Sequence, residues 1–192
     1  MALNKITYTD KVNTSGLKTP EINYINDVDL NEIKQVANAT IDSLEGIEVK
    51  IGANAGLTTQ GTNAVAVGNQ AGQTSQGIKA VSIGLLAGND TQGESSVAVG
   101  ANAGKTTQGL SAVAVGNSAG KTSQGVNSIA VGNSAGNDTQ GIDSIAIGRS
   151  AGLTNQSANS VCLGDSSAVT GTLQVQLGKS GTTTYAYGAV QD

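Results

Sequence analysis

The stretch QGVNSIAVGNSAGNDT (124–139) is followed at once by QGIDSIAIGRSAGLTN (140–155), which repeats its pattern position by position. The period of sixteen residues holds over seven repeats without an insertion. It is clearest in one glycine column, which comprises Gly52, Gly68, Gly84, Gly100, Gly116, Gly132, Gly148 and Gly164. A fixed period predicts a solenoid, because one added residue would break the backbone ladder between neighbouring turns.

Two further columns keep the same period. Alanine-glycine pairs occur at 55–56, 71–72, 87–88, 103–104, 119–120, 135–136 and 151–152. Glutamine-glycine pairs occur at 60–61, 76–77, 92–93, 108–109, 124–125 and 140–141. The next pair is Gln156-Ser157. We therefore expect the stack to be most regular in its middle and to fray near residue 157, as terminal turns usually do.

Each repeat also contains a short alternating segment, such as Ala64–Gly68, that predicts a strand ended by a glycine with positive φ. The β-branched residues lie on one face, which we expect to point into the roll. They are Val65, Val67, Val81, Ile83, Val97, Val99, Val113, Val115, Ile129, Val131, Ile145 and Ile147.

Small residues occupy the opposite face of these strands. They are Ala66, Ser82, Ala98, Ala114, Ala130, Ala146 and Cys162. A strand face toward water normally carries long polar side chains, whereas small residues let another backbone approach closely. We interpret this column as a subunit interface, because a solitary coil filled by two β-branched residues per turn would be marginally stable.

Composition excludes several classes of protein. The chain has 192 residues, of which 38% are hydrophobic and only 2% aromatic, and a formal net charge of −4. This balance lacks the basic stripe that nucleic acid requires. No secretory signal or long apolar span is present, so we expect a soluble chain that contacts no membrane. A single cysteine excludes an intrachain disulfide framework.

The flanks of the repeat differ from it. Residues 1–28 read as an extended arm, and residues 29–46 as an α-helix with Asp29 as its N-cap and Gly46 near its C-cap. This helix is short enough to need a partner, which is either the first solenoid turn or a self-associating bundle of copies. The β-roll is assigned to residues 47–164, and a short β tip to residues 165–192.

The repeat contains few side chains that could act in catalysis or bind a metal. There is no histidine, and its acids are Asp90, Glu94, Asp138 and Asp143, so we expect no enzyme, no cofactor and no catalytic or metal-binding residues. Asparagines at turn positions are expected to adopt left-handed backbone. They are Asn54, Asn69, Asn102, Asn117 and Asn133. Cys162 is either a buried stand-in for alanine or a residue near a symmetry axis.

One repeated polar surface is expected along an outer corner. Its hydroxyls are Thr59, Ser75, Thr91, Thr107, Ser123 and Thr139, followed by the glutamines from Gln60 to Gln156. These columns can simply stack along the corner. Alternatively they bind ice, although ice-binding solenoids favour Thr-x-Thr strands, or they contact host glycans weakly and in multiple copies.

Three repeats carry a resemblance to a known family. NSIAVGNSAG (127–136), DSIAIGRSAG (143–152) and SVAVGANAG (96–104) resemble the head repeats of trimeric autotransporter adhesins of the YadA type. The resemblance covers residues 49 to 164 and implies an all-β, left-handed parallel β-roll in a homotrimer. The Thr-Thr-Gln-Gly variant looks like the form found in viral fibres.

Both ends add to this resemblance. DLNEIKQVANATID (29–42) resembles a helix near the N-terminus of phage tail and capsid fibre proteins, and QVQLGKSGTTTYAYGAVQD (174–192) resembles the segment before their self-cleaving chaperone. We therefore expect a virion fibre on a phage head or tail. It would attach to capsid or tail protein through residues 1–46 and contact a host-surface glycan or protein. The alternative is a fragment of a bacterial surface adhesin.

Overall fold

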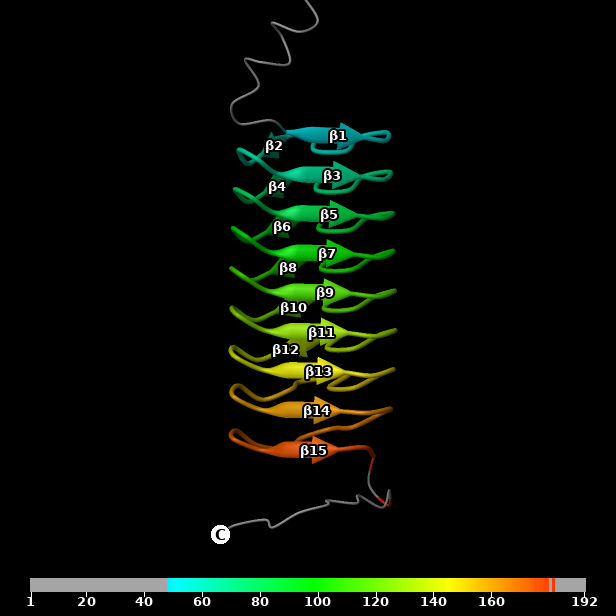
Figure 1. The fold of residues 1–192 in the computed structure, drawn as a ribbon, viewed down its shortest axis with the longest axis vertical. Coiled ribbons are helices and arrows are strands. Elements are labelled where there is room, and N and C mark those ends of the chain that lie inside the picture. Colours follow the sequence, from blue (N-terminus) through cyan, green and yellow to red (C-terminus); the bar gives the residue numbers. More distant parts are fainter. Residues whose placement is uncertain (1–47, 180, 182–192) are drawn as a thin grey trace, which may run out of the picture. The chain divides into compact units, whose positions relative to one another are not determined.

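The computed structural model describes residues 48–179 and 181. These residues fall within Gly46–Asp192, the second of the two units into which the chain divides. The expected arm over 1–28 and helix over 29–46 lie outside the described residues. Within the described residues the fold is an all-β parallel solenoid without a helix, as Figure 1 shows.

Two parallel sheets form the walls of the solenoid. The nine-stranded sheet contains β1 (Val49–Ile51), β3 (Val65–Val67), β5 (Val81–Ile83), β7 (Val97–Val99), β9 (Val113–Val115), β11 (Ile129–Val131), β13 (Ile145–Ile147), β14 (Val161–Leu163) and β15 (Val175–Leu177). The six-stranded sheet contains β2 (Thr59–Gln60), β4 (Ser75–Gln76), β6 (Thr91–Gln92), β8 (Thr107–Gln108), β10 (Ser123–Gln124) and β12 (Thr139–Gln140). Each regular turn contributes one strand to each sheet.

The register confirms the period read from the sequence. Val65 pairs with Val81 and Ala66 with Ser82, so each residue stacks on its equivalent sixteen positions later. The nine-stranded sheet continues past residue 164, because β15 pairs with β14 through Val161 and Val175. This last step takes two residues fewer than the regular turns.

Two tight turns close each coil. In the turn that follows β3, Ala71 N–H donates to Gly68 O at 3.2 Å, and in the turn that precedes β5, Ala80 N–H donates to Gly77 O at 3.2 Å. Gln70 and Lys79 occupy the third positions with φ of 57° and 58°, which is the type II arrangement. Gly68 has a φ of 131°, so the expected positive-φ glycine at the strand end is confirmed.

The prediction of left-handed backbone at turn asparagines holds for only some of them. Asn54 and Asn102 have φ of 59° and 57°, as expected for left-handed turn residues. Positive φ is not found at Asn69, Asn117 or Asn133, so that prediction is wrong for these three. They precede the left-handed position, which Gln70, Ser118 and Ser134 occupy in those turns.

The Gln-Gly glycines are required by the stacking of one turn on the next. A Cβ built on Gly109 would lie 2.6 Å from the carbonyl carbon of Gly125, in the turn that follows. Every regular turn imposes this close approach on its neighbour. Ser157 replaces the glycine where the shorter step to β15 begins, which explains why the sequence pattern departs there.

The assignment of the two strand faces was wrong. The small column is completely buried inside the chain's own coil, with Ala66, Ala114 and Cys162 at 0% exposure. The β-branched residues point outward: Val65 is half-buried and Ile83 is 40% exposed. A sixteen-residue coil encloses a narrow space that also has to hold side chains from the facing sheet, so this strand column admits only small residues and the larger Val and Ile side chains lie outside.

Small residues and one amide fill the interior of each turn. Alternating with the strand column are buried positions such as Ala64 and Ala71, both at 0% exposure. From the six-stranded sheet the interior receives one glutamine per turn, for example Gln108 at 2% exposure. The described core is therefore narrow, as the absence of aromatic residues from the repeat predicts.

Candidate functional site

The outward face of the nine-stranded sheet is a regular apolar surface. Figure 1 shows the strands of this sheet stacked in order, and an aliphatic residue occupies each of the two outward positions of every strand. The most exposed members are Ile51 at 60%, Val175 at 65%, Leu177 at 43%, Ile147 at 42% and Ile83 at 40%. Contiguous apolar surface of this kind usually marks an interaction site.

A third apolar file flanks this face. It takes one residue from each turn that leads into a strand of the nine-stranded sheet, at the position just before the residue with left-handed backbone. Its members are Ile78 at 46% exposure, Leu110 at 47%, Val126 at 36% and Ile142 at 51%. Glu94 interrupts the file with an exposed carboxylate. The apolar surface is thus three files wide over much of its length.

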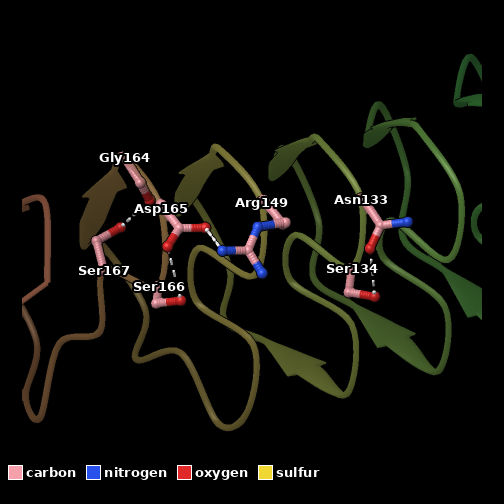
Figure 2. Close-up of polar contacts among 7 residues, drawn as sticks. All are labelled: Asn133, Ser134, Arg149, Gly164, Asp165, Ser166 and Ser167. Atoms are coloured by element: carbon pink, nitrogen blue, oxygen red, sulfur yellow. Dashed lines mark hydrogen bonds and ion pairs between the residues drawn. The ribbon is translucent and has the colours of Figure 1, made fainter.

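The opposite flank is mostly polar. It carries Asn117, Asn133, Arg149 and Asp165, and its apolar members are Ala53, Ala101 and Leu85, of which Leu85 is 50% exposed. Figure 2 shows the polar contacts of this corner, where Arg149 Nη2 lies 2.8 Å from Asp165 Oδ1. Both partners are well exposed, so the pair adds at most about 1 kcal/mol of stability. The two flanks of the apolar face therefore differ in chemistry.

Hydroxyl side chains cover the six-stranded sheet on its outer surface. The expected column from Thr59 to Thr139 is exposed along its length, and Thr58, Thr74, Thr106 and Thr154 lie beside it. The glutamines that follow these hydroxyls were expected on the same corner, and that prediction is wrong. Gln76 is only 3% exposed, because alternation along the strand turns it into the coil.

Inside the coil each glutamine amide bonds to the nine-stranded wall. Gln124 Nε2 donates to Val113 O at 2.7 Å and to Ser128 O at 3.3 Å, and the same pattern recurs in other turns. Several of the buried Oε1 atoms have no hydrogen-bond partner. They belong to Gln60, Gln76, Gln124, Gln140 and Gln156. The amide column links the two walls of the coil and is not a surface for ligands.

The acids of the repeat remain apart. Asp143 Oδ1 accepts a hydrogen bond of 3.0 Å from Asn127 Nδ2, which joins two neighbouring turns at the surface. Within residues 48–179 and 181, no group of three or more His, Cys, Asp or Glu side chains could hold a metal ion. Asp90, Glu94 and Asp138 are exposed at separate positions.

Cys162 is the buried stand-in for alanine. It is a free thiol at 0% exposure, and it pairs in register with Ala146 inside the coil. Burial raises the pKa of the Cys162 thiol, while hydrogen bonds to the backbone of Val169 and Gly152 and to the Ser167 side chain act in the opposite direction. The alternative position near an axis between copies is wrong, because this column faces its own core.

Comparison with known proteins leaves the family open. No protein-family model matches the chain, and no curated protein matches it either. Among the described residues no helix is long and apolar enough to cross a membrane.

Sequence reasoning missed the outward apolar face because it placed the same residues inside. One signal could have located it. Side chains inside the coil must fit its width, and the positions from Ala66 to Cys162 hold only Ala, Ser or Cys. The neighbouring positions alternate among Val, Ile and Leu, so their side-chain volume is not held constant from turn to turn.

Proposed function

We propose that this chain is a structural fibre subunit of a bacteriophage virion, and that it associates as a parallel homotrimer of left-handed β-rolls. Its role is mechanical and adhesive, without catalysis. The family and the number of copies come from the resemblance to YadA-type head repeats and to viral fibres. The exposed apolar face of the nine-stranded sheet is the observation that carries self-association.

The outward face has the properties of an interface between copies. Its two files are uninterrupted by charge from Val49 to Leu177, and several of its side chains are 40% exposed or more. Burial of such side chains contributes roughly 25 cal/mol for each Å² of apolar surface removed from water. A second copy that presents the same face would cover it along its whole length.

Unlike flanks favour a parallel arrangement of copies over an antiparallel pair, in which like flanks would meet. In a parallel arrangement the apolar flank, represented by Leu110 and Ile142, meets the polar flank of the next copy. Such head-to-tail contacts close into rings when the rotation allows. Three copies around one axis would bury all three nine-stranded sheets and leave the hydroxyl-bearing sheets outward, where multivalent contact with a host glycan or protein is geometrically open.

Attachment to the particle is assigned to residues 1–46. This assignment rests on the resemblance of 29–42 to the N-terminal helix of phage fibre proteins. A capsid and a tail position fit it equally, and the partner in either case is a virion protein. The virion is therefore the proposed location of this protein.

The mass of the full chain in native buffer tests the trimer. Light scattering should give about three times the chain mass of 18.9 kDa. Ile147→Lys places a charge on the apolar face and should lower that mass while the roll stays folded. Thr107→Lys is the matched control, because it adds the same charge to the exposed hydroxyl column. A single-chain mass for the unmodified protein would overturn the homotrimer.

The genes beside this one test the virion assignment. Capsid or tail genes on either side support a phage fibre. A reading frame that continues into an export and membrane-anchor domain would instead support the alternative, a trimeric adhesin of a bacterial surface. Ice binding by the exposed hydroxyl column is a third and less favoured function, which thermal hysteresis of the purified protein would reveal.

A further inference from the structure

The buried strand column has a long polar residue at each end. Lys50 in β1 pairs in register with Ala66, and Gln176 in β15 pairs with Cys162. Every described position between them in this column is Ala, Ser or Cys. Lys50 and Gln176 therefore occupy the first and last places of a file that is otherwise made of small side chains.

Both residues keep their polar groups in contact with other polar groups at the ends. Lys50 Nζ lies 3.3 Å from Glu48 Oε2, and the two side chains are 44% and 38% exposed. Gln176 Nε2 donates to Gly178 O at 2.9 Å.

β1 and β15 are the two edge strands of the nine-stranded sheet (Figure 1). Val49 N–H donates to Ala64 O at 3.0 Å and Gly68 N–H to Ile51 O at 2.7 Å, so Val49 and Ile51 direct their backbone groups toward β3. Lys50, between them, directs its N–H and C=O toward the edge at which no further strand lies among residues 48–179, because backbone groups alternate in direction along a strand. An edge of this kind is a template for pairing with another chain.

The edge of β15 is complementary to that of β1. Val161 N–H donates to Gln174 O at 2.8 Å, so β14 bonds onward to β15 in the regular manner. By the same alternation Val175 and Leu177 direct their backbone groups away from β14. A second copy could therefore set its β1 against β15 in parallel and continue the ladder.

The outward side chains would also match in such a pairing. Val175 would stack on Val49 of the next copy, and Leu177 on its Ile51, as Val and Ile stack throughout the roll. These ends are apolar and uncovered: Val175 is 65% exposed, Leu177 43% and Leu173 83%. Within the nine-stranded sheet only the buried column would be mismatched, because it would bring Lys50 against Gln176.

We propose that Lys50 and Gln176 are end-stops, which prevent copies of this chain from joining end to end through β15 and β1. Pairing would carry the Lys50 ammonium into a space sized for methyl groups and away from water, where a charge is strongly disfavoured. An inward-pointing charge on an edge strand is a recognised protection against such growth. The end-stops act on a single chain or on a side-by-side assembly alike, so they do not depend on the proposed trimer.

The test uses the full chain with Lys50→Ala and Gln176→Ala, singly and together. Alanine is the residue of this column in most turns, so the double variant should fold, with a melting temperature no lower than that of the unmodified protein. Sedimentation velocity should show its mass rising with concentration, and negative-stain images should show filaments. Lys105→Ala is the control, because it removes one lysine charge far from both ends and should leave the mass unchanged.

A second variant distinguishes edge-strand pairing from non-specific aggregation. Lys50→Pro with Gln176→Ala also removes the ammonium, but proline has no N–H for an incoming strand, and it is tolerated on an edge. This variant should return to the mass of the unmodified protein. The proposal is overturned if the double alanine variant keeps the unmodified mass, or if the proline variant forms filaments equally well.

Discussion

Ser82 Oγ donates a hydrogen bond of 2.6 Å to Oε1 of Gln92 inside the coil. Gln92 Nε2 in turn donates to Oε1 of Gln108 at 3.1 Å, in the next turn. One buried serine thus accompanies two satisfied glutamine oxygens, in its own turn and in the next, whereas the glutamine oxygens of the other turns, such as that of Gln124, have no partner. The Ser82 hydroxyl orients the Gln92 amide, whose Nε2 then donates to Oε1 of Gln108.

Ala114→Ser should therefore stabilise the roll. Ala114 occupies the position of Ser82 relative to Gln124, whose Oε1 is buried without a partner. A new hydroxyl there supplies the missing donor and should raise the free energy of unfolding by about 0.5–1.5 kcal/mol, measured by chemical denaturation. Ser82→Ala should lower it by a similar amount. A loss of stability in Ala114→Ser would show that the coil has no room for the hydroxyl.

Leu86 is the outlier among the left-handed turn residues. Its φ is 57°, and the equivalent residues in other turns include Gln70, Asn102 and Ser118. Left-handed backbone costs roughly 1–2 kcal/mol for most residues and less for asparagine. Leu86→Asn should therefore raise the midpoint of denaturation, corresponding to about 0.5–1 kcal/mol. The reverse exchange at the equivalent position, Asn102→Leu, should lower it, and equal midpoints for both variants and the unmodified protein would contradict this account.

Much of the fold could be predicted from periodicity, but the direction of the strand faces could not. The period of sixteen and the glycine columns require stacked coils, because the Cβ of any other residue at Gly109 would meet the backbone of Gly125. Alternation along β9 separates Ala114 from Val113 and Val115 without saying which side is inside. That choice depends on the width of the closed coil, which also has to admit a glutamine from the facing sheet.

The same reasoning explains the misplaced glutamines. Thr107 and Gln108 are adjacent polar residues, and composition alone suggests that both face water. Because they form the two-residue strand β8, they must point to opposite sides. Gln108 enters the coil, where its amide bonds to Val97 O at 2.7 Å, and Thr107 remains outside. Only the hydroxyl half of the expected polar surface exists.

Gly109→Ala tests the close approach between turns. The added Cβ would lie 2.6 Å from the carbonyl carbon of Gly125, so the backbone of one turn must shift. Overpacking of this kind typically costs about 1–3 kcal/mol, which a denaturation curve would resolve. Ser157→Ala, at the end of the same column, should change stability by less than about 0.5 kcal/mol. Equal effects at the two positions would contradict the stacking explanation.

Because of Cys162, the free energy of unfolding of the roll should decrease as the pH rises into the alkaline range. Burial raises the pKa of the thiol in the folded chain, whereas in the unfolded chain it titrates near its usual value of about 8.5. The unfolded state therefore loses its proton first, so the contribution to stability is fully present below about pH 8.5 and is lost as the pH rises toward the folded pKa.

Cys162→Ala removes this titration and leaves the other ionisable groups in place. Denaturation curves from pH 7 to 10 should show the unmodified protein losing stability relative to the variant as the pH rises, because lysines and tyrosines contribute equally to both. The difference should be nearly constant between about pH 7 and 8, where the thiol is protonated in both states. Parallel curves across the whole range would mean that the Cys162 thiolate is accommodated in the folded coil, against the burial found for this column.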